Sequence, residues 1–288
     1  MHKLFLAAAV TLVAQLGHAT PVDPLPWSDL IVFGDSLSDQ GNTGPGAVAT
    51  NGQTWASQLG TTPWREGGTN YAVIGATAAE DIATFDLDDQ IGLFRDTPAT
   101  FGPDPLVVLY FGGNDLLNGG DAASVAAALS AIGTGLSTLA TEFGFTRFAL
   151  PGLPDLAQIP RYVGAPEAPL VSAASQALNA GLAQLAQNSS AAGLDVTYVD
   201  IAQIFSEIIA DPADFGFSNV TKDCQRGQIS CEVFLFLDDI HPTEATHTLI
   251  AETVVSTVTP APVPLPAGLW FMLGGIGILL LQRRRPAT

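Results

Sequence analysis

Short apolar runs and longer helical stretches divide the middle of this chain into expected strands and helices. Four mostly apolar runs, bounded by Gly, Pro or Asp, have the length of buried strands: Leu30–Phe33, Leu106–Phe111, Arg147–Leu150 and Val196–Ile201. Ala- and Leu-rich stretches of helical character lie between and after them: Ala122–Phe143, Val171–Ala192 and Thr243–Val258. Apolar strands that alternate with helices predict an α/β fold with a parallel sheet covered on both faces. Ligands of such sheets bind beyond the carboxyl ends of the strands.

The first residues have the pattern of a secretory signal peptide. Lys3 precedes the apolar run Leu4–Leu16, and the small residues Gly17 and Ala19 stand at positions −3 and −1 before Thr20. A membrane anchor is the weaker interpretation, because this run is too short to span a bilayer. We therefore expect residues 1–19 to be removed on export and residues 20–258, which contain no internal repeat, to form one domain.

The last residues, 259–288, have the pattern of a membrane-associated tail. Four prolines form a stiff spacer, and the uncharged segment Leu265–Leu281 then runs into Arg283–Arg285. At 1.5 Å per residue this segment reaches about 26 Å, a minimal span for a hydrocarbon core of about 30 Å. By the positive-inside rule the arginines stay in the cytoplasm and the domain lies outside.

Composition and charge exclude several classes of protein. The chain has 288 residues, of which 47% are hydrophobic and 13% are charged, so it is not an intrinsically disordered protein. Its formal net charge of −18 repels phosphate backbones, which excludes nucleic acid as a partner and disfavours anionic membrane surfaces. Cys224 and Cys231 are the only cysteines, and in an exported protein we expect them to form a disulfide.

A serine follows the first expected strand at the place where a nucleophile is accessible. The strand Leu30–Phe33 runs directly into Gly34-Asp35-Ser36-Leu37-Ser38, and Gly34 permits a sharp turn. The side chain of Ser36 is then exposed at the sheet edge, and its backbone amide can face a developing oxyanion. An ordinary turn in which Asp35 or Ser36 caps the next segment explains the pentapeptide about equally well.

Two further loops offer donors for an oxyanion. The second strand ends in Gly112-Gly113-Asn114-Asp115, where Asn114 supplies a neutral amide, although a helix cap is the simpler interpretation of Asn114 alone. Gly75 lies in a third glycine-containing loop and offers a backbone amide. The acidic run Asp86–Asp89 is interpreted as the start of a helix rather than as a calcium site.

The histidine count narrows the choice of a general base. Because His2 and His18 leave with the signal peptide, only His241 and His247 remain, which excludes a His-rich metal site. Asp238 precedes His241 by three residues, so on a turn it can accept from one ring nitrogen while the other faces a serine hydroxyl. The neighbouring Asp239 is expected to point elsewhere, and His247 is expected to be a packed or solvated helical residue.

The order of these motifs, GDSL, Gly, GGND and D-x-x-H, resembles the GDSL or SGNH hydrolase superfamily, and most closely its secreted lipases, lecithinases and haemolysins. Further matching segments are Gly68–Ala72, Leu150–Asp155 and Asp238–Thr243, and the resemblance spans about Ile31 to Ala251. It implies a flavodoxin-like three-layer α/β/α sandwich, and an enzyme that needs no metal or other cofactor. It also implies a nucleophile at Ser36, a base at His241, an orienting carboxylate at Asp238, and an oxyanion hole from the amides of Ser36 and Gly75 and the side chain of Asn114.

The tail resembles a second known pattern. The sequence Val263-Pro264-Leu265-Pro266-Ala267, followed by an apolar segment and an arginine cluster, looks like the VPLPA variant of the PEP-CTERM sorting signals. This resemblance implies a Gram-negative host, an exosortase-type processing enzyme as a partner, a membrane-held precursor, and delivery to the cell surface or its matrix. The sequence leaves open whether the tail is cut or is retained as a membrane anchor.

Three functions are compatible with these observations. The leading hypothesis is an exported esterase or lipase that works through an acyl-enzyme on Ser36. An acyltransferase would use the same residues, and a surface or matrix protein would retain only the fold. The resemblance to lipases suggests lipid esters, surface location suggests acetylated polysaccharide, and short-chain esters are a third class of substrate.

Overall fold

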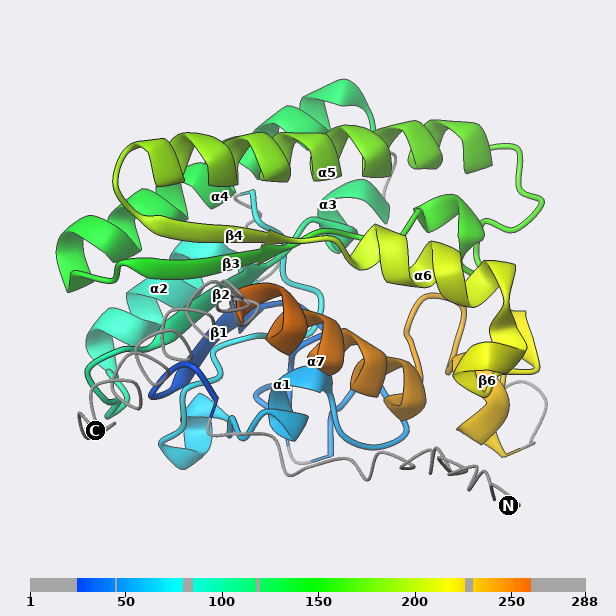
Figure 1. The fold of residues 1–288 in the computed structure, drawn as a ribbon, viewed down its shortest axis with the longest axis horizontal. Helices are drawn as coiled ribbons and strands as arrows, with labels where there is room; N and C mark the ends of the chain where they lie inside the picture. The colour runs from blue at the N-terminus through cyan, green and yellow to red at the C-terminus, as the bar shows by residue number, and fades with distance from the viewer. Residues whose placement is uncertain (1–24, 45, 80–84, 118–119, 226–229, 260–288) are drawn as a thin grey trace, which may run out of the picture.

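A four-stranded parallel sheet forms the centre of the fold (Figure 1). The computed structural model describes residues 25–44, 46–79, 85–117, 120–225 and 230–259. The strands lie in the order β1-β2-β3-β4, and all neighbours are parallel. Their bounds differ from the predicted ones by at most two residues at either end, so the predicted strands are confirmed: β1 Leu30–Gly34, β2 Leu106–Tyr110, β3 Arg147–Pro151 and β4 Asp195–Val199.

An irregular segment extends the sheet beyond β1. Asn70 pairs in parallel with Val32, and the Tyr71 and Val73 amides donate to the carbonyls of Val32 and Gly34. Counted as a strand, this segment gives the sheet the order 2-1-3-4-5, which is the flavodoxin-like order. The order reverses between β1 and β2, and ligands of such sheets bind at that point. The predicted fold class is therefore confirmed.

Helices cover both faces of the sheet and make it the middle layer of three. Helices α4 and α5 lie on one face, where α4 also contacts α2, while α1 and α7 lie together on the other face and α7 also contacts α6 (Figure 1). Three helices had been predicted, and they begin and end within three residues of the expected positions: α4 Ala122–Phe143, α5 Ala168–Ala191 and α7 Glu244–Val258. Of the other four, only the start of α2 Leu87–Asp96 was expected, from the acidic run before it. The remaining three were not predicted: α1 Trp55–Gln58, α3 Gly113–Leu117 and α6 Ile201–Ala210.

One helix of the described residues, α4, is long and apolar enough to cross a membrane. It contacts both α2 and α5, and its apolar side faces the core of the domain. Asp86 accepts hydrogen bonds from the amides of Asp88 and Asp89 and so caps α2, which confirms that the acidic run there starts a helix.

A small second sheet leads into the last loop of the domain. Strand β5 (Asn219–Asp223) pairs in parallel with β6 (Phe234–Phe236), and a disulfide joins Cys224 to Cys231 in the connection between them. The expected disulfide is therefore present. Single 3-10 turns complete the fold: Trp64–Glu66, Leu156–Gln158, Pro212–Phe215 and Cys231–Val233.

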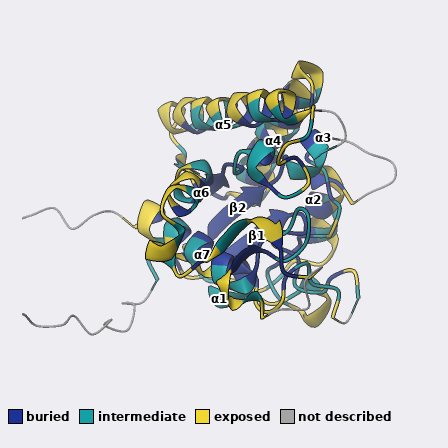
Figure 2. Cartoon of the chain, turned by 90° about the vertical axis from the view of Figure 1, so that its right-hand side faces the viewer, coloured by how far each residue is buried: buried dark blue, intermediate teal, exposed yellow. Residues whose placement is uncertain are grey.

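Burial is most complete in the central strands. All residues of β1 and β2 are buried (Figure 2). In β4, Asp195 is exposed and Thr197 and Tyr198 are only half-buried. The expectation of a buried fourth strand holds for Val196 and Val199 only, because β4 is an edge strand with a partner on one side only among the described residues. The predicted signal peptide (1–19) and all of the predicted tail (259–288) except Thr259 lie outside the described residues.

Candidate active site

Ser36 stands on a tight turn directly after β1. The carbonyl of Asp35 accepts hydrogen bonds from the amides of Ser38 and Asp39, and its carboxylate accepts one from the amide of Leu37. A side chain at Gly34 would place a Cβ 3.0 Å from the Tyr110 carbonyl oxygen, so β1 and β2 approach closely there and any larger residue would be crowded. The turn therefore presents Ser36 at the carboxyl end of the sheet. The expectation of an exposed side chain was wrong, because Ser36 lies in a cavity and only 8% of it is exposed.

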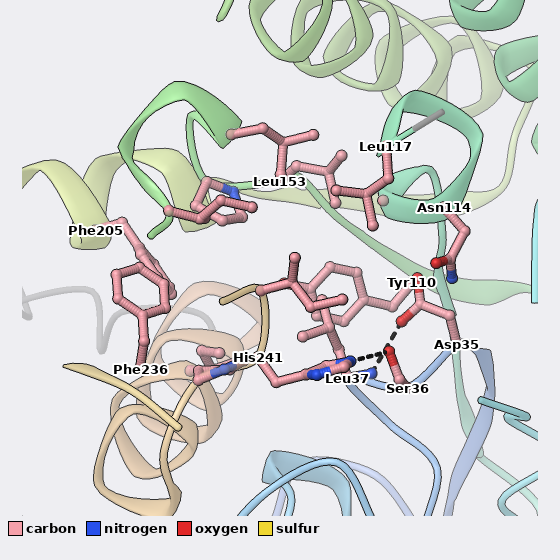
Figure 3. Close-up of a pocket in the computed structure, with 17 residues that line it drawn as sticks. Asp35, Ser36, Leu37, Tyr110, Asn114, Leu117, Leu153, Phe205, Phe236 and His241 are labelled. Carbon is pink, nitrogen blue, oxygen red and sulfur yellow. Dashed lines mark hydrogen bonds between the residues drawn. The ribbon is translucent and has the colours of Figure 1, made fainter. Parts of the chain in front are cut away.

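His241 connects Ser36 with Asp238. Its Nε2 lies 2.9 Å from the Ser36 hydroxyl oxygen (Figure 3). Its Nδ1 lies 2.8 Å from Oδ2 of Asp238. Oδ1 of Asp238 accepts hydrogen bonds from the amides of Ile240 (2.9 Å) and His241 (2.7 Å), and these bonds form the turn that carries the imidazole. A carboxylate, an imidazole and a hydroxyl in this order can move a proton from the hydroxyl to the ring.

The two neighbouring carboxylates have different surroundings. Burial raises the pKa of Asp238, but the hydrogen bonds from the His241 ring and from two backbone amides outweigh burial and hold this pKa below its ordinary value. Asp238 is therefore ionised at neutral pH and can stabilise an imidazolium. The side chain of Asp239 points away and pairs with Arg161, whose Nε lies 2.9 Å from Oδ2.

Asn114 lies at the start of α3 and lines the same cavity as Ser36 and His241. Its Nδ2 donates a hydrogen bond to the carbonyl of Ala76 at 2.8 Å, which takes one of its two N–H groups. The adjacent Asp115 accepts from the amides of Ala78 and Ala79, so α3 holds the 76–79 loop against the site. Asn114 is thus in the right region for an oxyanion donor.

Gly75 lies in a turn that begins at Val73, and Val73 is hydrogen-bonded to the last residue of β1. Its φ is +82°, which favours glycine, and the Ala76 amide closes the turn on the carbonyl of Val73. Val73 itself donates to the carbonyl of Gly34, two residues before Ser36. Gly75 does not line the cavity next to Ser36, so its amide remains a predicted donor.

A buried polar cluster that the sequence analysis missed holds this turn. Oδ2 of Asp39 accepts a hydrogen bond from the amide of Ile74 at 2.9 Å, and Oδ1 accepts from the amide of Asn42 at 2.7 Å. Asn42 Nδ2 in turn donates to the carbonyls of Asn70 and Ala72. The signal was the polar run that follows Ser36, because polar residues so close to a buried strand need internal partners.

Two other ionisable groups near the site carry strong shifts. Burial raises the pKa of Asp35 to about 7, although the hydrogen bond from Leu37 and the electrostatic interaction with His241 act in the other direction. His247 is fully buried, its Nδ1 accepts from the amide of Trp55 at 3.3 Å, and burial lowers its pKa to about 3. His247 is therefore a packed, neutral residue of α7.

The cavity beside Ser36 has a volume of about 50 Å³ and is mostly apolar. Among the described residues, no three His, Cys, Asp or Glu side chains are grouped so that they could hold a metal ion. The lining residues come from β2, α3, α6, β6 and α7 and from the loops after β1, β3 and β6: Asp35, Ser36, Leu37, Tyr110, Gly113, Asn114, Leu117, Leu153, Pro154, Leu156, Ile159, Phe205, Phe236, Ile240, His241, Pro242 and Ile250.

Comparison with known proteins finds relatives that are named esterase, lipase and acyltransferase. The chain is 28% identical to the esterase EstA of Pseudomonas aeruginosa, over 87% of this chain and 50% of EstA. It is 27% identical to Lipase 1 of Photorhabdus luminescens, over 81% of this chain and 50% of the lipase, so it spans about half the length of both relatives. It is 29% identical to the phosphatidylcholine-sterol acyltransferase of Aeromonas hydrophila, over 79% of this chain and 73% of that enzyme.

Solved structures support the same fold. A mutant of Axe2, an acetyl-xylooligosaccharide esterase from Geobacillus stearothermophilus, superposes with a TM-score of 0.50 at 16% identity, over 81% of this chain and 95% of that chain. The model of the family "GDSL-like Lipase/Acylhydrolase" matches residues 30–254, from the start of β1 to the last turns of α7. This match includes every residue of the site described above, and the chain therefore belongs to the GDSL-like lipase/acylhydrolase family.

Proposed function

We propose that this chain hydrolyses carboxylic esters through an acyl-enzyme on Ser36. The observation that carries the proposal is the continuous contact from the Ser36 hydroxyl through the imidazole of His241 to Asp238, with distances of 2.9 and 2.8 Å. The family and its relatives named esterase and lipase support the same reaction class.

The reaction follows from the positions of these groups. The Ser36 oxygen attacks the ester carbonyl while Nε2 of His241 takes the hydroxyl proton, and ionised Asp238 stabilises the imidazolium. The negative charge on the carbonyl oxygen is accepted by the amides of Ser36 and Gly75 and by the second N–H of Asn114. The tetrahedral intermediate then expels the alcohol, which receives the proton from His241. Water repeats the sequence on the acyl-enzyme and releases the acid.

Transfer of the acyl group to another alcohol is the second candidate function. It needs the same acyl-enzyme and differs only in the acceptor that replaces water. The relative named phosphatidylcholine-sterol acyltransferase supports this alternative, and this chain covers 73% of that enzyme. A non-catalytic surface or matrix protein is the third, and the intact Ser36–His241–Asp238 contacts argue against it.

We also propose that the protein is exported by a Gram-negative cell. The support is the signal-peptide pattern of residues 1–19 and the VPLPA-like tail of residues 259–288, which would hold the precursor in the membrane for an exosortase-type enzyme. The functional domain would then comprise residues 20–258. Sequencing of both ends of the protein recovered from the cell surface tests both cleavage events.

The activity is tested with p-nitrophenyl butyrate and the purified domain. Ser36→Ala should abolish turnover and leave the circular dichroism spectrum and the Tm unchanged, while Ser137→Ala, a change at an exposed serine of α4, should retain full activity. Activity should survive EDTA, because the proposed chemistry needs no metal. Added glycerol separates the two reactions, since a transferase would form glyceryl butyrate. Substantial turnover by a folded Ser36→Ala variant would overturn the assignment.

A further inference from the structure

The cavity beside Ser36 is closed at its opposite end by two aromatic rings. Phe205 of α6 and Phe236 of β6 lie across the cavity from Ser36 and Asn114 (Figure 3). Their ring centroids are 6.3 Å apart, and the residues are only 4% and 1% exposed. The cavity is therefore a closed pocket at this end rather than an open channel.

The polarity of the cavity differs between its two ends. The polar groups Ser36, Asn114 and His241 lie where the ester carbonyl must be attacked. Away from them the walls are hydrocarbon: Leu153 and Ile159 come from the segment after β3 and are buried, and Ile250 of α7 is fully buried. A substrate would thus place its carbonyl at the polar end and an apolar group in the remainder.

The size of the cavity limits that apolar group. A volume of about 50 Å³ has room for roughly four groups of the size of a water molecule. A carbonyl or methylene group is of similar size, and the volume includes the polar end, so the space suits an acyl group of about four carbons with its carbonyl carbon counted. An acetyl group would leave much of the apolar wall without contacts, and a long fatty acyl chain would have to displace Phe205 or Phe236.

The acyl part of the ester is the group that should occupy a closed pocket. During the reaction the alcohol takes a proton and must leave before water can attack, whereas the acyl group stays bonded to Ser36. A pocket closed by Phe205 and Phe236 offers no exit to solvent at that end, so it fits the part of the substrate that remains.

We propose that this cavity is an acyl pocket for chains of about four carbons and that Phe205 sets the upper limit of chain length. The proposal rests on the proposed function and adds the substrate class, esters of short acyl groups. Among the three classes that the sequence leaves open, it selects short-chain esters over both long-chain lipids and acetylated polysaccharide.

The test measures kcat/KM on p-nitrophenyl acetate, butyrate and octanoate. Wild type should prefer butyrate. Phe205→Ala should raise the octanoate-to-butyrate ratio by at least about tenfold, the size of effect that a few methylenes have in a hydrophobic pocket. Leu153→Phe, which narrows the pocket, should raise the acetate-to-butyrate ratio. Phe101→Ala, a change at a partly exposed ring outside the cavity, is the matched control and should leave both ratios unchanged.

The outcomes separate the proposal from the function on which it rests. Phe205→Leu serves if Phe205→Ala does not fold, with a smaller shift in the same direction. If a folded Phe205 variant hydrolyses the esters well and its octanoate-to-butyrate ratio is unchanged, the acyl-pocket proposal is wrong and the proposed esterase function still holds. If wild type hydrolyses none of the p-nitrophenyl esters, the proposed function itself is wrong. If chain length matters in alkyl acetates and not in the acyl series, the pocket holds the alcohol and the proposal is wrong.

Discussion

Asp238 and His241 are joined through both oxygens of one carboxylate. Oδ2 faces the ring Nδ1 at 2.8 Å, while Oδ1 accepts the backbone amide of the same histidine at 2.7 Å. The carboxylate therefore forms the turn that carries the imidazole and also fixes which ring nitrogen faces Ser36. These two roles can be separated by mutation, because an asparagine retains an oxygen acceptor and loses the charge.

Asp238→Asn should lower kcat by about 10⁴, as loss of the charged partner of a catalytic histidine does in other serine hydrolases. The asparagine oxygen can still accept from the amides of Ile240 and His241, so the Tm should change little. Asp238→Ala loses these bonds too, and we expect it to lower both kcat and the Tm. Steady-state kinetics and thermal melts of both variants provide the measurement. Equal Tm values for the two variants would show that the carboxylate does not stabilise the turn.

Asn114→Ala should lower kcat by about 10²–10³, the usual cost of losing one oxyanion donor. The physical reason is that the second N–H of its side chain, not used by the Ala76 carbonyl, is available to the developing oxyanion. KM should change little if the donor acts mainly in the transition state. Asn188→Ala, at an exposed position of α5, is the matched control. A kcat within twofold of wild type would remove Asn114 from the oxyanion hole.

Asp39→Asn should lower kcat by about tenfold or more, because small misplacements of a catalytic group are costly. The Ile74 amide donates to Oδ2 of Asp39. An asparagine NH2 group in place of Oδ2 is itself a donor and could not accept this hydrogen bond. The turn that carries Gly75 should then move, while substrate binding and hence KM should change little. Asp39 is a positioning residue, so the split between kcat and KM, with the Tm as a check on folding, is the informative readout. If kcat stayed at the wild-type value and kcat/KM fell only because KM rose, Asp39 would not have this positioning role.

The sequence predicts those parts of the molecule that depend on local pattern. The strands β1 and β2 are buried on both faces, so their apolar runs identify them. Helices α2 and α6 have only ten residues each, too few for a helical period to stand out from the flanking segments, and their packing against distant elements stabilises them. The side-chain pair Arg161–Asp239 joins residues 78 positions apart, which no local pattern encodes.

The candidate site divides in the same way. The motifs identify Ser36, Asp238 and His241 because each follows a strand or stands on a turn. The buried hydrogen bonds of Asp39 depend on the path of the 70–76 segment beside β1, which the sequence does not reveal. The closure of the cavity by Phe205 and Phe236 likewise depends on how α6 and β6 meet, and both residues look like ordinary core positions in the sequence.

His247 should make the domain less stable in acid. Burial lowers its pKa from 6.5 to about 3, so below pH 6.5 the unfolded chain takes up a proton that the folded chain does not bind until about pH 3. The contribution of His247 to the free energy of unfolding is therefore largest above pH 6.5. It falls as the pH drops and is lower by about 2–3 kcal/mol at pH 4.5. Asp35 acts oppositely, because its raised pKa adds stability as the pH falls from about 7.

A comparison with His247→Gln isolates the histidine from the carboxyl groups. Glutamine keeps an acceptor for the Trp55 amide and does not titrate. Urea unfolding at pH 7.5 and pH 4.5 should show that the difference in unfolding free energy between wild type and variant shrinks in acid by about 2–3 kcal/mol. The same difference at both pH values would show that His247 is not responsible.

Reduction of the Cys224–Cys231 disulfide should weaken the segment that presents His241. The amides of Cys224 and Gln225 donate to the carbonyls of Phe236 and Leu237, so the bridged segment is hydrogen-bonded to the chain directly before Asp238. Closing so short a loop stabilises the domain by about 2–3 kcal/mol when entropy of the unfolded chain is the main effect. We therefore expect a lower Tm after reduction.

Activity on p-nitrophenyl butyrate should also be lost at temperatures where the circular dichroism of the domain is still native, because the segment that carries Asp238 and His241 loosens first. A Cys224→Ser, Cys231→Ser double variant should reproduce both effects without reductant. Intact-mass measurement with and without reductant verifies the bridge in the isolated protein. If activity and circular dichroism are instead lost together in the double variant, the disulfide stabilises the whole domain and does not act specifically on the segment that carries the base.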